Sequence, residues 1–356
     1  MKIPTIKTIL LSATLAAPTA LLLAAHGPPK TTKPMQAVLD QLASLGGKPI
    51  EQLTPQEART QPTPADAVKA LLQKRGQSTA PEAVAKVENK SIPGPGGEIA
   101  LRIYTPSGTG PFPVVLYIHG GGWVIADLDV YDSSPRALAN TAGAVVVSTH
   151  YRLAPEHPFP ASHDDTFAAY LWVRENAASF NGDPQRIAVA GESAGGNMAA
   201  AISLTARERK VPLPLHQVLV YPVAGTDMNT PSFKENANAK PLNQAMMVWF
   251  AGHEFKNPAD TKDPRIDLLH ADLRDLPPTT IITAQIDPLR SGGEMLADKL
   301  KAAGVKVDSK NYNGVTHEFF GMGAVLKESR DATRFAGKNL QKAFSRVRAK
   351  SPRGKE

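Results

Sequence analysis

The chain has 356 residues, of which 42% are hydrophobic and 21% charged, so it has the composition of a globular protein long enough for a sizeable core. It contains no cysteine, which excludes disulfides, iron–sulfur clusters, zinc–thiolate sites and a cysteine nucleophile. The formal net charge is +7, and part of the positive excess lies in the leader and the tail. No segment combines basic residues with side chains that read bases, so we expect no nucleic-acid partner.

The N-terminus has the pattern of a secretory signal peptide. The short basic segment MKIPTIK precedes the apolar run TILLSATLAAPTALLLAA. This predicts a signal peptide over residues 1–25 and export to the periplasm or the exterior. The alternative is an uncleaved N-terminal membrane anchor, although the run is barely long enough and contains Pro18. No later segment is long and apolar enough to span a bilayer, so we expect no membrane span in the mature chain.

A Pro- and Lys-rich linker at residues 26–34 leads into helical pieces over residues 35–80. Gly46 and Gly76 are predicted to end two of these helices. The segment is too small for a core of its own, so we expect it to pack over another part of the molecule.

From Val84 onward the pattern changes to short apolar runs that alternate with helix-like segments. Continuous apolar runs are typical of strands that are covered on both faces, and the alternation indicates an α/β fold. The expected strands are VAKVENKSI at 84–92, EIALRIYTP at 98–106, VVLYIH at 114–119, AVVVSTH at 144–150, RIAVAG at 186–191, HQVLVYPV at 216–223, TTIITAQI at 279–286 and VKVDSKNY at 305–312.

A longer insertion at residues 226–276 interrupts this alternation and includes the expected helix NQAMMVWFAGHEF. Together with residues 35–80 it is a candidate cap over the carboxyl edge of the sheet, where α/β proteins bind ligands. The remaining divisions are a core over 81–225 and 277–348 and a basic tail over 349–356. Two further helices are expected to start at serine caps, one at Ser133-Ser134 before Pro135 and one at Ser291.

The stretch GESAG at 191–195 lies between an apolar strand and an alanine-rich helix. In that context G-x-S-x-G predicts a nucleophile elbow, a strained turn that projects the Ser193 hydroxyl above the sheet. Gly191 and Gly195 lack the β-carbons that would clash where strand and helix approach. A helix that starts at Ala194 directs its positive dipole end toward the site.

A serine nucleophile needs a base, and the base needs an orienting acid. Asp287 directly follows the strand TTIITAQI, and His317 follows the last strand, which gives the chain order serine, acid, histidine. The other downstream histidines do not follow a late strand: His216 begins a strand, whereas His253 and His270 lie in the insertion.

The strand VVLYIH runs directly into HGGGW at 119–123. Three glycines allow backbone N–H groups to face a substrate, as stabilisation of an oxyanion requires. A nucleotide cradle is disfavoured because the Walker lysine and the G-x-G-x-x-G pattern are both missing. We expect His119 to shape this loop instead of transferring protons.

Together with YRLAPEHPFPA at 151–161, DPLR at 287–290 and THEFF at 316–320, these motifs resemble the hormone-sensitive-lipase-like family of α/β-hydrolases, the bacterial carboxylesterases. The resemblance implies a mostly parallel eight-stranded sheet flanked by helices, with a helical cap. It also implies oxyanion donors at Gly121, Gly122 and Ala194, and neither metal nor organic cofactor. Glu192 stands where one family branch has aspartate and another threonine. Arg152 and Glu156 are expected to form internal ion pairs.

The expected function is therefore a serine carboxylesterase that hydrolyses short- to medium-chain esters through an acyl-enzyme, as a monomer or a homodimer, with a small-molecule ester as its partner. One alternative is an amidase or deacetylase that uses the same three residues. The other is a non-catalytic receptor, although receptors of this fold typically lose the histidine that is present here as His317.

Overall fold

The computed structural model describes residues 29–348. The expected signal peptide and basic tail lie outside this range and stay predictions. Among residues 29–348, every helix is too short or too polar to cross a bilayer.

Eight strands form one sheet in the order β1-β2-β4-β3-β5-β6-β7-β8. The pairs β1–β2 and β2–β4 are antiparallel and the remaining pairs are parallel. The mostly parallel eight-stranded sheet expected from the sequence is confirmed. The strands are β1 (Lys86–Gly94), β2 (Gly97–Thr105), β3 (Phe112–Ile118), β4 (Val145–His150), β5 (Gly182–Glu192), β6 (Gln217–Val220), β7 (Thr279–Ile286) and β8 (Val307–Thr316).

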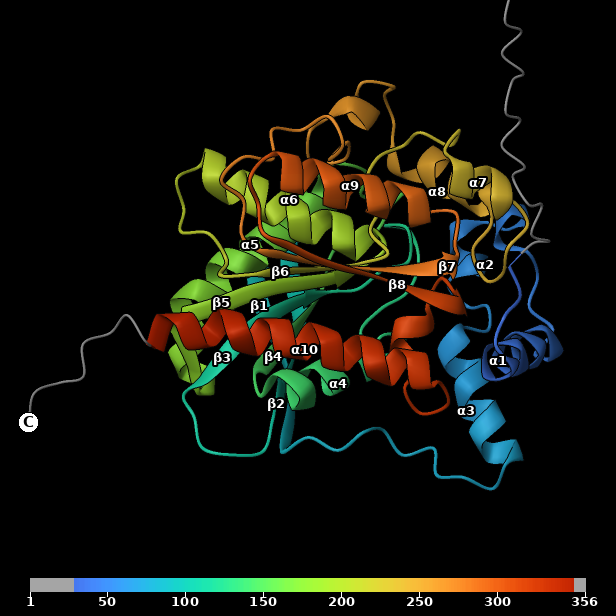
Figure 1. Cartoon of the computed structure of the whole chain (residues 1–356), viewed down its shortest axis with the longest axis horizontal. Helices are drawn as coiled ribbons and strands as arrows, with labels where there is room; N and C mark the ends of the chain where they lie inside the picture. Colours follow the sequence, from blue (N-terminus) through green and yellow to red (C-terminus); the bar gives the residue numbers. More distant parts are fainter. Residues whose placement is uncertain (1–28, 349–356) are drawn as a thin grey trace, which may run out of the picture.

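Helices cover both faces of the sheet, and each face has its own apolar core. Every residue of β3 is buried, which explains why its sequence is apolar throughout instead of alternating. The flanking helices are α4 (Ser133–Ala142) and α10 (Lys327–Arg348) on one face, and α5 (Ala161–Asn176), α6 (Ala194–Glu208) and α9 (Arg290–Ala302) on the other, as Figure 1 shows.

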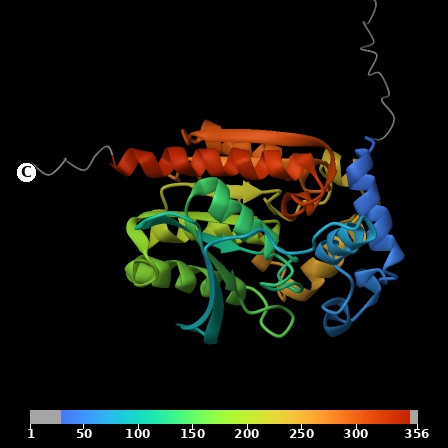
Figure 2. The same cartoon turned by 90° about the horizontal axis from the view of Figure 1, so that it is seen from below.

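Most of the remaining helices gather at one end of the sheet (Figures 1 and 2). The N-terminal segment supplies α1 (Lys33–Ser44), η1 (Ile50–Gln52), α2 (Pro55–Ala58) and α3 (Pro64–Lys74). The insertion supplies α7 (Pro231–Glu235), α8 (Gln244–Glu254) and η3 (Asp260–Lys262); two short helices elsewhere are η2 (Ala177–Phe180) and η4 (Phe319–Gly321). The indole of Trp249 in α8 donates to the carbonyl of Leu53 at 3.1 Å, so the two segments touch although they are far apart in sequence.

The observed helix ends agree only in part with those predicted from the sequence. Gly46 and Gly76 follow the ends of α1 and α3 with φ values of +74° and +64°, the left-handed conformation expected of glycine stops. The expected serine caps are wrong. Helix α4 is preceded by Asp132, and Ser133 and Ser134 already lie inside it. Ser291 likewise lies inside α9, where its hydroxyl accepts from the backbone N–H of Ser232 at 3.1 Å.

Candidate active site

Ser193, Asp287 and His317 meet at the carboxyl edge of the sheet. Each follows the end of a different parallel strand, β5, β7 and β8, and the carboxyl ends of parallel strands share one edge. The Nε2 atom of His317 lies 3.0 Å from the Ser193 hydroxyl, and its Nδ1 lies 2.7 Å from a carboxylate oxygen of Asp287. Both distances are within hydrogen-bonding range, so a proton can pass from the hydroxyl to the imidazole while the acid holds the ring.

The corner that carries Ser193 is strained and tightly packed. Ser193 has φ +57° and ψ −119°, which places its side chain at the tip of the turn between β5 and α6. A β-carbon on Gly195 would lie 2.1 Å from the carbonyl oxygen of Ile118, and one on Gly191 would lie 2.1 Å from that of Gly195. Both glycines are therefore required by the close approach of strand and helix, as the sequence predicts.

The glycine loop after β3 faces the same point. Gly121 and Gly122 have φ values of +92° and +57°, and no described residue accepts a hydrogen bond from either backbone N–H. The N–H of Ala194 belongs to the first residue of α6, where a helix leaves its amides without partners. Three amides are thus free to bind an oxyanion.

His119 holds the base of this loop. It is fully buried, and its Nδ1 lies 2.9 Å from the carbonyl oxygen of Gly120. The Tyr151 hydroxyl also donates to that carbonyl, at 2.9 Å. Burial lowers the pKa of His119 to about 3, so the ring is neutral at ordinary pH, which fits the loop-shaping role expected of it.

The rival residues lie elsewhere. The Nε2 of His216 lies 2.8 Å from the Thr280 hydroxyl, and the Nδ1 of His270 lies 2.7 Å from a carboxylate oxygen of Asp267. His253 stacks edge-on against Trp249. None of these histidines contacts Ser193.

The expected internal ion pairs are confirmed. Arg152 donates to both carboxylate oxygens of the buried Asp165 at 2.8 Å. Arg59 of the N-terminal segment donates to both oxygens of Glu156 at 2.9 and 2.7 Å, and so ties that segment to the loop after β4.

Electrostatics favour a protonated imidazole at His317. Burial opposes the charged ring, but the attraction and hydrogen bond of Asp287, with the nearby Glu318, outweigh it and raise the pKa of His317 above its usual 6.5. The imidazolium that forms during proton transfer is stabilised in this way.

Two further acids flank these residues, and their surroundings are not apparent from the sequence. Glu192, next to Ser193, is buried and accepts hydrogen bonds from the hydroxyls of Tyr117 and Tyr221. Burial, together with the nearby Glu318, raises the pKa of Glu192 to about 7. Glu318, next to His317, accepts a hydrogen bond from Tyr131 at 2.7 Å, and burial raises its pKa as well.

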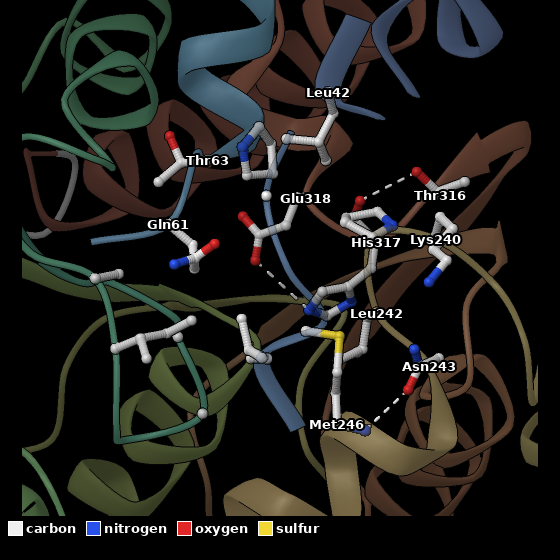
Figure 3. A pocket seen from close by; sticks show the side chains of 18 of the residues that line it. Leu42, Gln61, Thr63, Lys240, Leu242, Asn243, Met246, Thr316, His317 and Glu318 are labelled. Atoms are coloured by element: carbon white, nitrogen blue, oxygen red, sulfur yellow. Dashed lines mark hydrogen bonds and ion pairs between the residues drawn. The ribbon is translucent and has the colours of Figure 1, made fainter. Parts of the chain in front are cut away.

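A cavity of about 1350 Å³ opens above Ser193 and His317. Its lining comes from the glycine loop, the N-terminal segment and the insertion, and it is apolar for the most part. Figure 3 shows Leu42, Leu242 and Met246 around it, with His317 and Glu318. Within the described residues, no three His, Asp or Glu side chains are placed to hold a metal ion together.

Residues 115–321 match a family model described as the alpha/beta hydrolase fold. The chain belongs to the α/β-hydrolase fold family. Among its relatives, carboxylesterase NlhH of Mycobacterium tuberculosis is 43% identical over 241 residues, which cover 66% of this chain and 76% of the relative. The ethyl acetate hydrolase of Pseudomonas putida is 35% identical over 239 residues, which cover 66% of this chain and 75% of the relative.

Solved structures of esterases have the same fold as this α/β-hydrolase. An esterase from the archaeon Pyrobaculum calidifontis superposes with a TM-score of 0.80 at 36% identity and covers 88% of this chain and 98% of its own. A thermostable esterase from Pseudomonas putida has a TM-score of 0.80 at 35% identity, with 90% and 99% covered. Because it shares this family with named carboxylesterases, the chain is a carboxylic-ester hydrolase of the hormone-sensitive-lipase-like group.

Proposed function

We propose that this hydrolase cleaves short- to medium-chain carboxylic esters through an acyl-enzyme on Ser193. The observation that carries the proposal is the pair of hydrogen-bonding distances that His317 makes, 3.0 Å to the Ser193 hydroxyl and 2.7 Å to Asp287. A weakly nucleophilic hydroxyl becomes reactive when a neighbouring base removes its proton in the transition state.

In the acylation step, the Ser193 oxygen attacks the ester carbonyl while His317 takes its proton. The carbonyl oxygen becomes an oxyanion that accepts hydrogen bonds from the amides of Gly121, Gly122 and Ala194. His317 then donates the proton to the leaving alcohol, and Asp287 stabilises the charged ring throughout. Water later attacks the acyl group by the same route and releases the acid.

The size and lining of the cavity support the choice of substrate class. A volume of about 1350 Å³ with mostly apolar walls accommodates an acyl chain of moderate length. One relative, the ethyl acetate hydrolase of Pseudomonas putida, is named for a short ester. We further propose that the N-terminal segment and the insertion act together as the cap that closes this cavity.

The test is hydrolysis of p-nitrophenyl esters from acetate to palmitate, with matched anilides for comparison. We expect the highest kcat/KM on the shorter acyl chains and little cleavage of anilides. Ser193→Ala is expected to lower kcat by a factor on the order of 10⁴ or more. Near-wild-type turnover by correctly folded Ser193→Ala would overturn the assignment of the nucleophile.

We also propose that the protein is exported. The support is the basic segment followed by an apolar run within residues 1–25. Expression of the whole chain in a bacterial host, followed by cell fractionation and mass spectrometry of the N-terminus, tests this. A mature N-terminus near residue 26 in the periplasm or medium is expected, whereas an intact N-terminus in the membrane fraction would support the anchor instead.

A further inference from the structure

Glu318 places a carboxylate beside the nitrogen that transfers protons in the proposed mechanism. Its Oε1 lies 3.8 Å from the Nε2 of His317, the same nitrogen that lies 3.0 Å from the Ser193 hydroxyl. All three residues line the cavity. Figure 3 shows the side chains of Glu318 and His317 converging there, with a dashed line between them.

The position of the Glu318 carboxylate is fixed by its backbone conformation and by a hydrogen bond. Its backbone has φ +70°, a left-handed conformation that is uncommon for a residue other than glycine. The hydroxyl of the buried Tyr131 donates to Oε1 at 2.7 Å. A carboxylate oxygen accepts more than one hydrogen bond, so Oε1 keeps acceptor capacity for a partner in the cavity.

We propose that Glu318 positions the water molecule that releases the acyl group from Ser193. The two acceptor atoms are 3.8 Å apart, which is the right separation for one water to donate a hydrogen bond of about 2.8 Å to each. Once Ser193 is acylated it has no hydroxyl proton to give, and the Nε2 of His317 is free to accept from that water. With both hydrogens directed to acceptors, the water turns a lone pair toward the acyl carbon. This inference rests on the proposed role of Ser193 as nucleophile.

The step balances without a further reactant. The water oxygen forms a bond to the acyl carbon, one water proton passes to His317, and the carbonyl electron pair moves to the oxyanion. The carbonyl then re-forms, the bond between the acyl carbon and the Ser193 oxygen breaks, and His317 returns its proton to that oxygen. Glu318 only accepts a hydrogen bond, so it is a positioning residue and exchanges no proton.

Glu192 offers a matched comparison. It is also a glutamate adjacent in sequence to one of the reacting residues, but its two oxygens accept from Tyr117 and Tyr221 and it is not among the residues that line the cavity. Removing its charge changes the electrostatics near His317 without removing an acceptor from the cavity.

The experiment measures how the acyl-enzyme divides between water and methanol. Methanol has one hydroxyl hydrogen, which goes to His317, so it does not need Glu318. For the full chain with p-nitrophenyl acetate and a fixed methanol concentration at pH 8, Glu318→Met is expected to raise the ratio of methyl acetate to acetate about tenfold, the effect of one lost hydrogen bond to a charged group. Because the ratio belongs to the acyl-enzyme, a partly unfolded preparation does not alter it.

Two variants sharpen the result. Glu318→Gln keeps an oxygen acceptor and is expected to give a ratio closer to that of the wild type. Glu192→Gln is expected to leave the ratio unchanged. An unchanged ratio in Glu318→Met, or an equal rise in Glu192→Gln, would overturn the role of Glu318. Methyl acetate formation by Ser193→Ala would instead overturn the proposed nucleophile, so the two failures are distinguishable.

Discussion

Gly122 is constrained by a residue more than a hundred positions away. The backbone at this position has φ +57°, a conformation that favours glycine. A β-carbon there would lie 2.3 Å from the ring of Phe250 in α8. The methyl group of Gly122→Ala would push the proposed oxyanion donor and the helix apart, so we expect kcat to fall by about 10²-fold, as for a lost oxyanion donor.

The matched control for Gly122→Ala is Gly143→Ala. Gly143 has φ +59°, but beyond its neighbours in the chain no described residue lies within 4 Å of the place that a β-carbon would take. Gly143→Ala should lower the free energy of unfolding by about 1 kcal/mol and leave the activity unchanged, because it has the backbone strain of Gly122→Ala without the clash. The double variant Gly122→Ala/Phe250→Ala should recover part of kcat. Equal activity losses at Gly122 and Gly143 would show that the contact with Phe250 is irrelevant.

The raised pKa of His317 predicts the acid limb of the pH profile. The proposed mechanism needs a neutral imidazole, so kcat/KM should fall as the pH drops through a midpoint above 6.5, the usual value. Asp287→Asn removes the largest attraction that raises this pKa. In that variant the midpoint should move to lower pH, and kcat should fall by about 10⁴-fold. A wild-type midpoint below 6.5 would contradict the electrostatic description of the site.

Residue identity at the site was largely predictable, whereas its electrostatics were not. Ser193, Asp287 and His317 stand out because each follows a strand in an order that a known fold explains. The partners of Glu192 and Glu318 are tyrosines from β3, from the residue directly after β6 and from the loop before α4, and only the folded chain brings them together. No local pattern marks such contacts.

At the scale of elements, α8 ends on a buried carboxyl group. Glu254 is fully buried, and one of its oxygens has only a 3.3 Å contact with the Ser162 hydroxyl while the other has no partner among the described residues. Burial raises its pKa to about 9. The folded state therefore keeps a proton that the unfolded chain releases near pH 4.5, and this glutamate lowers the stability as the pH rises toward 9.

Glu254→Gln removes that penalty, because the amide has the shape of the protonated acid and no charge to bury. We expect the variant to raise Tm at pH 8 by a few degrees, roughly 2–4 °C, and by less at pH 5. Thermal unfolding monitored by circular dichroism at both pH values provides the measurement. Glu175→Gln on the exposed side of α5 is the control and should change Tm equally little at both. A benefit of Glu254→Gln that does not grow with pH would refute the protonated state.

The sequence predicted all eight strands within a few residues. The buried parallel strands at the centre of the sheet are recognisable because they are continuous apolar runs bounded by polar residues, whereas β1 is antiparallel and mostly exposed. The prediction failed at the starts of α4 and α9. Serines near a helix start are compatible both with capping and with tertiary contacts. Here tertiary contacts prevail, since Ser133 donates to the carbonyl of Gly321 and Ser291 bonds to Ser232.

Across the whole molecule, Arg59 links the N-terminal segment to the loops that follow β3 and β4. Besides its two bonds to Glu156, it donates to the carbonyls of Val124 and Ala154, both at 2.8 Å. We expect Arg59→Met to lower the free energy of unfolding by on the order of 1–2 kcal/mol, a value reduced by partial solvent exposure of the ion pair. The variant should also raise KM, because the loosened segment lines the cavity.

Limited proteolysis and substrate kinetics measure both effects of Arg59→Met. The control is Arg75→Met, which changes an exposed arginine at the end of α3. Cleavage within residues 29–80 should accelerate only when Arg59 is replaced. If both variants behave like the wild type, the bonds of Arg59 do not hold the segment in place.

The sequence also predicted that two separate segments would cap the carboxyl edge of the sheet: residues 35–80, which are too small for a core of their own, and the insertion at 226–276, which interrupts the alternation of strands and helices. It did not predict how they meet. The contact between Trp249 and Leu53 and the close approach of Phe250 to Gly122 depend on the full three-dimensional arrangement.

The two ends of the described chain have very different positions relative to the cavity. Pro29, Lys30 and Thr31 line it, whereas α10 runs to Arg348 at the opposite end of the molecule (Figures 1 and 2). A bulky affinity tag or a resin attached just before residue 29 would therefore lie beside the cavity. For immobilised preparations, attachment through the C-terminus keeps the support away from the cavity and is the orientation in which the full activity of the enzyme should be retained.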